Sequence, residues 1–458
     1  MLDKLLAFYR DSILRARPLR LLVTAACLHL LIAVAIYTAG RLSILPEPFA
    51  NGSERFAFDT LIYQQGAEAL TEVLSNDGIG AWLRTPSEPH VRLYSLSYFL
   101  FKPLFGYSTL ALEPLNLLYY LASLLLVYRI GKEAFERDTG VTAATLIALW
   151  PSFLLHTTQV LKDPLFIVCM LALVCVWVIW LKAIGSWKGA LLTVLPGVTA
   201  VAILAWMKSN MWESVLVLTF IGCGLLLVRQ AHARRIFIRN LLSAALLVTF
   251  TLVVPIRSTL VHQRDQQAVM VAEQEGQSSY VWVSLGSRIA QRRRAFSRYR
   301  QGQGSMIDGD VFFNSTSDIV RFLPRATLTG LFAPFPQMWF ASAATTGRAA
   351  RLLSGAETFL FYFAALAAGF CAYAERRNFA MWLLLLVALI NIVALGLVVP
   401  NIGALFRLRY VFWMLIIILG ARGSVVLARR FCAGRAAKNM ALAPQTHSPY
   451  PVESSPGG

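Results

Sequence analysis

Long apolar runs recur along the whole chain, and they constrain its fold more than any other feature. About 20 consecutive apolar residues are needed to cross the hydrocarbon core of a bilayer, and ten stretches of the sequence approach or reach that length. They are Leu21–Gly40, Ser108–Ile130, Val141–Thr157, Pro164–Lys182, Gly189–Trp206, Met211–Val228, Ile236–Ile256, Glu357–Ala374, Ala380–Pro400 and Leu408–Leu427. Only 14% of the residues are charged, against about 25% in soluble proteins. The sequence therefore predicts an all-α polytopic membrane protein with about ten transmembrane helices.

The basic residues indicate which ends of these helices face the cytoplasm. The chain carries a formal net charge of +18, and short loops rich in Lys and Arg are expected on the cytoplasmic side. Such loops are Arg129–Asp138, Lys182–Lys188, Arg229–Arg235 and Glu375–Arg377. An even number of spans places both termini on that side, and both termini are basic. We therefore expect a basic interfacial segment at residues 1–20, a transmembrane domain at 21–430 and a disordered cytoplasmic tail at 431–458.

Two loops on the outward side are long and cover about residues 41–107 and 257–356. The second contains twelve arginines and six acidic residues, with a cluster of arginines at 288–300. On a soluble protein this cluster would suggest nucleic acid. Outside a membrane it favours contact with lipid phosphates or an anionic glycan, and a solvated basic face is the simpler alternative. Within these loops, Leu93–Phe105 and Leu328–Phe340 are too short and Pro-interrupted to span, so they are expected at the interface.

The first outward loop contains a candidate catalytic acid. In FAFDTLIYQQGAEAL, residues 56–70, the residues Asp59, Tyr63 and Ala67 recur every four positions and share one face of a predicted helix. A carboxylate that faces a membrane-embedded cleft can act as general base on an acceptor hydroxyl. From the spacing alone, the more common role of such an acid is to stabilise the start of a helix.

Ionisable residues at other outward helix ends are further candidates, because charges near the membrane are usually functional. Lys162 and Asp163 precede Pro164, where Asp163 can either cap the helix or belong to the same site. Lys208 and Glu213 flank another outward turn. There, the lysine can alternatively extend its amine to the membrane interface.

Arg407 and Arg409 begin the last predicted span in GALFRLRYVFWM. A guanidinium binds phosphate oxygens well, and lipid head groups offer both arginines the same partners. Because residues two apart on a helix point to different faces, only one of the two is expected to face a site. The six cysteines show no Cys/His spacing typical of a metal centre, so the sequence predicts no metal ligands and no required cofactor.

The order of these features resembles the GT-C superfamily of membrane glycosyltransferases. The resemblance rests on the Asp59 loop directly after the first span and on four further segments. These are LYSLSYFLFKPLFGYS (93–108), NLLYYLASLLLVYRIGKEAF (116–135), ALWPSFLLHTTQVLKDPLF (148–166) and FRLRYVFWMLIIILGARG (406–423). The branch that it resembles comprises protein O-mannosyltransferases, aminoarabinose transferases and RgtA/B/C/D-like bacterial enzymes.

The resemblance implies a GT-C-like bundle in a bacterial inner membrane. Such an enzyme would move a sugar from a polyprenyl-phosphate donor to a lipid, glycan or protein acceptor on the outer face, with no nucleic-acid partner. The family carries a catalytic acid in its first outward loop, which corresponds to Asp59, and a second acid in the next outward loop, which corresponds to Asp163. The family usually has an acidic pair at the first position, whereas Asp59 stands alone, so a divalent metal is compatible with the resemblance without being required.

The leaving phosphate of such a donor needs cations that take up its developing charge, while the acceptor hydroxyl needs a base. The candidates for binding substrate and phosphate are Tyr63, Lys162, Lys208, Arg407 and Arg409. Two other functions fit the same features. One is a transporter or flippase for a lipid-linked glycan, and the other is a polymerase or ligase for such a glycan.

Overall fold

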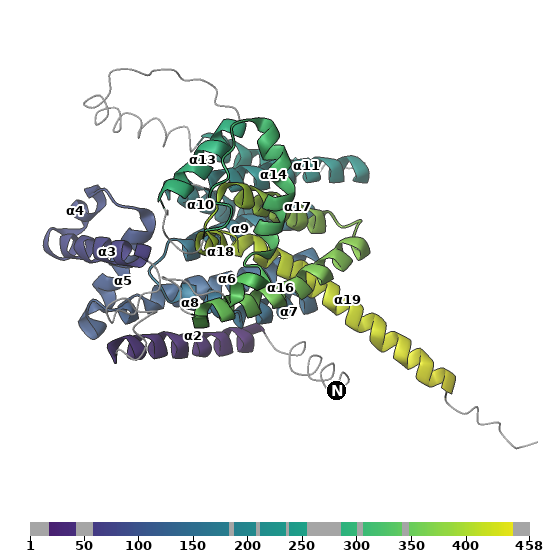
Figure 1. Ribbon diagram of the computed structural model, residues 1–458, viewed down its shortest axis with the longest axis horizontal. Coiled ribbons are helices and arrows are strands. Elements are labelled where there is room, and N and C mark those ends of the chain that lie inside the picture. The colour runs from purple at the N-terminus through teal and green to yellow at the C-terminus, as the bar shows by residue number, and fades with distance from the viewer. Residues whose placement is uncertain are drawn as a thin grey trace, which may run out of the picture.

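The computed structural model describes residues 18–42, 58–182, 187–207, 211–234, 238–253, 285–299, 306–340 and 348–442. Among these residues, eight helices are long and apolar enough to cross a membrane, and each matches a predicted span. They are α2 (Pro18–Arg41), α6 (Glu113–Ala134), α9 (Asp163–Lys182), α10 (Trp187–Trp206), α11 (Trp212–Ala233), α16 (Arg348–Ala374), α17 (Phe379–Val398) and α19 (Tyr410–Leu442). The span predicted at Ile236–Ile256 is represented by a shorter apolar helix, Ile238–Val253. The described residues contain no β-strand, so this part of the chain is an all-helical membrane bundle (Figure 1).

The span predicted at Val141–Thr157 is present as a bent pair of helices. The structure divides this span into α7 (Arg137–Ala148) and α8 (Pro151–Thr157), which meet at an angle of 68°. Proline lacks an N–H donor and disfavours helical backbone at the residue before it. Trp150 accordingly has an extended conformation, with φ −77° and ψ 108°, and Pro151 begins the new helix at a position that suits proline.

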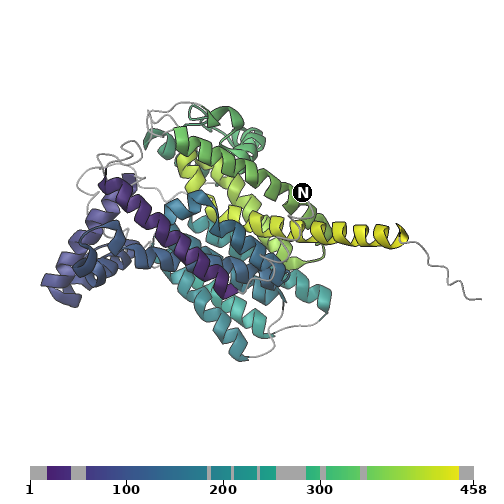
Figure 2. The same cartoon turned by 90° about the horizontal axis from the view of Figure 1, so that it is seen from below.

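The first outward loop folds into helices that pack together at one end of the bundle. Helices α3 (Phe58–Asn76), α4 (Gly78–Arg84) and α5 (Pro89–Phe105) lie side by side there (Figures 1 and 2). Arg92 of α5 is buried and donates hydrogen bonds to backbone carbonyls at the end of α4, including that of Trp82 at 2.6 Å. These hydrogen bonds join α5 to the end of α4, so the segment forms a compact unit at one end of the bundle.

The second outward loop contributes α13 (Leu285–Tyr299), α14 (Thr316–Phe332) and the single turn α15 (Pro336–Trp339). None of the three is a candidate span, and neither is α5. The two segments predicted to be too short to span, Leu93–Phe105 and Leu328–Phe340, lie in these outer helices and in the residues directly after them. Their predicted non-spanning character is therefore confirmed.

Two arginines of the 288–300 cluster hold the outer helices together, which the sequence did not predict. Arg293 is 1% exposed and donates hydrogen bonds to the carbonyl oxygens of Val311 at 2.7 Å and Leu397 at 2.8 Å. Arg292 forms a bidentate ion pair with Glu213 at the start of α11, at 2.8 and 2.5 Å. Both side chains are engaged within the protein. Because Arg293 is buried, the predicted contact with lipid phosphate or glycan does not apply to it, whereas Arg292 remains 43% exposed.

Glycines allow α19 to pack closely against α16. A Cβ atom at Gly423 would lie 2.0 Å from the carbonyl oxygen of Ala367, and one at Gly420 would lie 2.5 Å from that of Ala364. Only glycine permits such an approach between two helix backbones. The close pairing fixes α19 and, with it, the short helix α18 (Ile402–Leu408) that directly precedes it.

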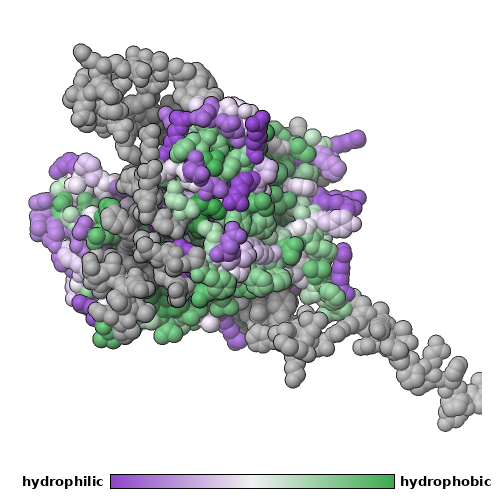
Figure 3. Space-filling model, in the orientation of Figure 1, coloured by the Kyte–Doolittle hydropathy of each residue, from purple (hydrophilic) through white to green (hydrophobic). Residues whose placement is uncertain are grey.

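The molecule has two polar ends with an apolar region between them. In Figure 3, hydrophilic residues gather over α3 and α4, over α13 and α14 and at the opposite edge, while hydrophobic residues cover much of the area between. Helix α9 connects the two ends through the core, since 83% of its apolar stretch is buried. Its 20 residues correspond to a length of about 30 Å, which matches the hydrocarbon core of a bilayer.

Candidate active site

Asp163 and Arg407, both predicted from the sequence, lie together at one end of the bundle. Asp163 is the first residue of α9, and Arg407 lies near the end of α18. Nε of Arg407 is 3.7 Å from Oδ2 of Asp163, and the two side chains are 17% and 14% exposed. The fold thus brings an acid and a guanidinium from distant parts of the chain into one half-buried ion pair.

His156 of α8 stands beside this pair. Its Nδ1 lies 2.7 Å from the carbonyl oxygen of Ser152 and 3.1 Å from the hydroxyl of Tyr410. A carbonyl can only accept a hydrogen bond, so Nδ1 carries a proton, and Nε2 of the neutral ring is left with its lone pair. The charges of Arg407 and Asp163 are close enough to act electrostatically on this ring. The same end of the bundle therefore holds a carboxylate, a guanidinium and a partly buried imidazole.

Buried polar contacts hold α8 at both of its ends. At the start, a carboxylate oxygen of Glu357 from α16 accepts a hydrogen bond from the backbone N–H of Ser152. At the end, Thr157 contacts Nε2 of His29 at 3.0 Å, and Nδ1 of the same ring lies 2.6 Å from Glu113. Since these partners come from α16, α2 and α6, three helices fix the position of the short segment that carries the imidazole. Buried polar side chains in a membrane protein are usually satisfied in this way.

Arg409 is fully buried and has a packing role. It donates hydrogen bonds to the carbonyl oxygens of Gly330, at 2.8 Å, and Ala333, and its guanidinium lies 3.8 Å from the ring centre of Trp413. Arg409 therefore ties the end of α14 to the start of α19. The sequence predicted that only one of Arg407 and Arg409 faces a site, and Arg407 remains the candidate, since Arg409 is engaged within the protein.

The helices of the first outward loop reach the same end of the bundle. Tyr63 of α3 packs edge-on against His90 of α5, with ring centres 4.4 Å apart. Burial, aided by the positive charge of Lys162, lowers the pKa of His90 to about 3, so its ring is neutral. The hydroxyl of Tyr94 donates to the backbone of the segment before Lys162, at 3.1 Å from the carbonyl oxygen of Leu161. Tyr63 and Lys162 are thereby connected through α5 to the residues that lead into the Asp163 pair.

Two predicted residues lie partly or wholly outside the described part of the structure. The backbone of Asp59 lies in the first turn of α3, four residues before Tyr63, and its side chain is outside the described part of the protein. Lys208 lies outside the described residues altogether. Among the described side chains, no three His, Cys, Asp or Glu residues form a group that could hold a metal ion. The metal compatible with the family resemblance thus has no ligand set in this part of the structure.

His156 and Tyr410 were missed from the sequence for a physical reason. Both lie in apolar stretches, ALWPSFLLHTTQV and FRLRYVFWM, where a single polar residue is ordinarily part of the core. The break before Pro151 was the available signal, since a bent span places its second half at an angle to the bundle and exposes that segment to new partners.

The structure is similar to solved structures of an archaeal enzyme. A solved structure of the oligosaccharyltransferase AglB from Archaeoglobus fulgidus, in complex with an inhibitory peptide and a dolichol-phosphate, is 16% identical with a TM-score of 0.48, covering 94% of this chain and 52% of that chain. For an apo form of the oligosaccharyltransferase from the same archaeon, the identity is 15%, the TM-score 0.46 and the coverage 95% and 53%. For a form tethered to an acceptor peptide containing the NVT sequon, the identity is 16% and the TM-score 0.46, with 96% of this chain and 53% of that chain covered.

The chain therefore spans about half the length of the proteins whose structures it resembles. No protein-family model matches the sequence, and no curated protein does. Because the identity and the TM-scores are low, the roles of individual residues rest on contacts within this chain.

Proposed function

We propose that this chain is a membrane glycosyltransferase that moves a sugar from a polyprenyl-phosphate donor to a lipid, glycan or protein acceptor. The observation that carries the proposal is the Asp163–Arg407 ion pair with His156 beside it, at one polar end of the bundle. A lipid-linked phosphate lies at the level of a membrane surface, so a cation at the end of a transmembrane helix can reach it. The resemblance of the sequence to GT-C enzymes supports the same function.

The proposed reaction breaks the bond between the sugar C1 and the phosphate oxygen and forms a bond between C1 and the acceptor oxygen. The electron pair of the broken bond goes to the phosphate, where Arg407 and Lys162 would neutralise the developing charge. The acceptor proton goes to a base, which we assign to Asp59. Asp163 would orient Arg407 through their ion pair.

The direct experiment is transfer from a labelled polyprenyl-phosphate sugar in vesicles that contain the purified protein. The wild type should release polyprenyl phosphate and pass label to an acceptor fraction, and Asp59→Asn should be folded but inactive. As a matched control, Asp77→Asn removes a carboxylate at the other end of α3, between α3 and α4. Transfer by wild type that is no faster than in empty vesicles with every donor tested would refute the proposal.

One observation favours transport of a lipid-linked glycan as a second candidate. Broken helices are common in transporters, and α7–α8 is a broken span next to the candidate site. The same vesicles distinguish the two functions. Transport would move the labelled lipid between leaflets with its sugar–phosphate bond intact, whereas transfer would cleave that bond. We further propose that the membrane is a bacterial inner membrane and that both termini are cytoplasmic.

A further inference from the structure

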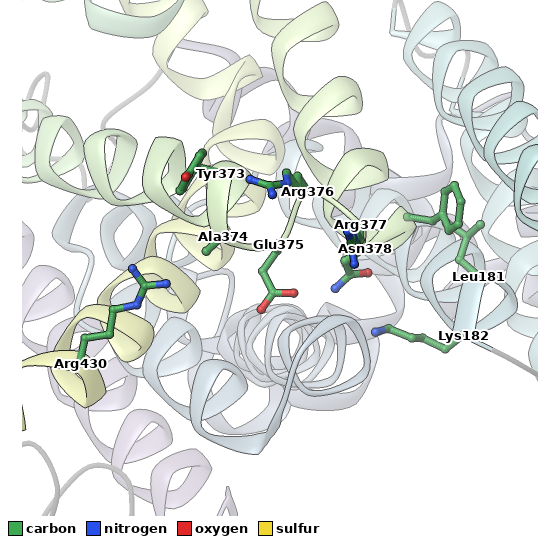
Figure 4. A pocket seen from close by; sticks show the side chains of 10 residues that line it. Leu181, Lys182, Tyr373, Ala374, Glu375, Arg376, Arg377, Asn378 and Arg430 are labelled. Atoms are coloured by element: carbon green, nitrogen blue, oxygen red, sulfur yellow. The ribbon is translucent and has the colours of Figure 1, made fainter. Parts of the chain in front are cut away.

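A basic pocket lies at the end of the bundle opposite the candidate active site. It has a volume of about 770 Å³ and is formed by the end of α9, the turn between α16 and α17 and a distal part of α19 (Figure 4). Lys182 ends α9, and Asp163 begins it, so about 28 Å of helix separate the pocket from the Asp163–Arg407 pair. The pocket is therefore independent of the proposed transfer site.

Four cationic side chains line this pocket, which also contains one carboxylate. The cations are Lys182, Arg376, Arg377 and Arg430. Figure 4 shows Lys182 and Arg430 on opposite sides of Glu375. Glu375 accepts hydrogen bonds from Nε of Arg422 at 2.9 Å and from its Nη2 at 2.7 Å, so a fifth cation already neutralises it. None of the four lining cations forms an ion pair within the described residues.

Side chains of the protein bind several of the backbone carbonyl oxygens around the pocket. The end of α9 would present carbonyl oxygens, but Arg229 donates to those of Trp180 and Lys182, at 2.8 and 2.9 Å. The turn carbonyl of Arg376 accepts from the indole of Trp382 at 2.8 Å. The positive end of the α17 dipole begins at the pocket wall. The negative dipole ends of α9 and α16 also reach the pocket, so its positive charge rests on the four lining cations.

We propose that this pocket binds the head group of an anionic lipid that carries two phosphates. Phosphate is the anion that Arg and Lys clusters bind best, and cations on both sides of Glu375 match a ligand with two separated charges. One exposed aromatic side chain belongs to the pocket wall, since Tyr373 lines the pocket and is 67% exposed. Its ring would contact acyl chains at the membrane surface. A volume of 770 Å³ is ample for such a head group.

Native mass spectrometry of the full-length protein in detergent tests the proposal. Diphosphatidylglycerol, with two phosphates, should remain bound at lower lipid concentration than phosphatidylglycerol, with one, and phosphatidylcholine should not be retained. The double variant Arg376→Gln/Arg377→Gln should weaken retention of diphosphatidylglycerol by about tenfold or more, as expected for lost charge-assisted contacts. The single variant Arg430→Gln, on an exposed part of α19, should weaken it in the same direction.

The control is Arg84→Gln/Arg321→Gln, which removes two exposed arginines of the outward loops. It should bind diphosphatidylglycerol as the wild type does. Equal loss in the control and in the pocket variants would overturn the proposal, because retention would then depend only on net charge. Inorganic pyrophosphate tests the source of the phosphates. Displacement of the lipid by micromolar pyrophosphate would show a site for a soluble anion and overturn the lipid assignment.

Discussion

Replacement of Arg407 by glutamine removes the cation of the candidate site and leaves a shorter, uncharged side chain with an amide donor. The charge pair at 3.7 Å has a direct attraction of about 4 kcal/mol at the effective dielectric constant of a protein surface. Most of this is offset by the cost of taking the two half-buried groups out of water. The loss that matters for transfer is the contact between Arg407 and the leaving phosphate, worth about 1.5–3 kcal/mol. We therefore expect kcat/KM for the donor to fall roughly tenfold to a hundred and fifty-fold.

Asp163→Asn tests whether the ion pair holds Arg407 in position. If Asp163 acts by holding Arg407 in place, Asp163→Asn should weaken transfer in the wild type but have little further effect in Arg407→Gln. The coupling between the two substitutions should be about 1–3 kcal/mol. Arg407→Lys should restore only part of the activity, because an ammonium lacks the paired donors of a guanidinium.

The assay is initial-rate transfer from a labelled polyprenyl-phosphate sugar, with Arg321→Gln as a matched control on an exposed arginine of α14. Chromatographic behaviour and thermal midpoint establish that each variant is folded. Two results would refute the reasoning. The first is wild-type kinetics for a folded Arg407→Gln. The second is independent, additive losses for Asp163→Asn and Arg407→Gln, which would mean that the ion pair does not orient the arginine.

Four further outcomes are expected. Asp59→Asn should reduce transfer by about 10²–10⁴, the usual loss on removing a general base; unchanged turnover would leave this acid a helix-stabilising role. Gly423→Ala should destabilise the protein by roughly 1–3 kcal/mol through the clash with α16, whereas Gly369→Ala, whose added Cβ would meet nothing within 4 Å, should not lower the thermal midpoint. Because the pKa of His90 is lowered to about 3 in the folded protein, the unfolded chain binds the extra proton below pH 6.5, and stability should fall as the pH drops from 6.5 towards 3. The free energy of unfolding should be about 2 kcal/mol lower at pH 5 than at neutral pH. Thermal unfolding of His90→Gln should show a smaller dependence on pH. An introduced cysteine at Arg292 should react with an impermeant reagent from outside intact cells, and labelling only after permeabilisation would reverse the proposed topology.

Apolar length alone was enough to locate the transmembrane helices. Each of the eight spans follows from the roughly 20 residues that a bilayer requires. The break at Trp150 was hidden because the residues on both sides of Pro151 are apolar, and hydropathy averages across a bend. A proline inside an apolar run is compatible with a kinked continuous helix or with a true break, and only the packing partners of α8 decide between them.

The candidate site was predictable in part. The spacing of Arg407 and Arg409 indicated that they face different surroundings, but not which one is buried, because that depends on the carbonyl groups of α14. The proximity of Asp163 to Arg407 could not be derived either, since it depends on how α9 and α18 pack. His156 was missed because one histidine in an apolar stretch gives no pattern, and its partner Tyr410 is distant in sequence.

The buried arginines of the outer half are bound to backbone carbonyl oxygens and not to carboxylates. Arg409 and Arg293 each join two or more helices in this way. An interaction between a buried cation and a peptide dipole is scarcely screened by mobile ions, whereas the exposed pair between Arg429 and Asp138 at the other end is. Raising the ionic strength should therefore weaken the exposed pairs Arg429–Asp138 and Arg292–Glu213, while the carbonyl contacts of Arg293 and Arg409 continue to hold α13 and α14 on the bundle.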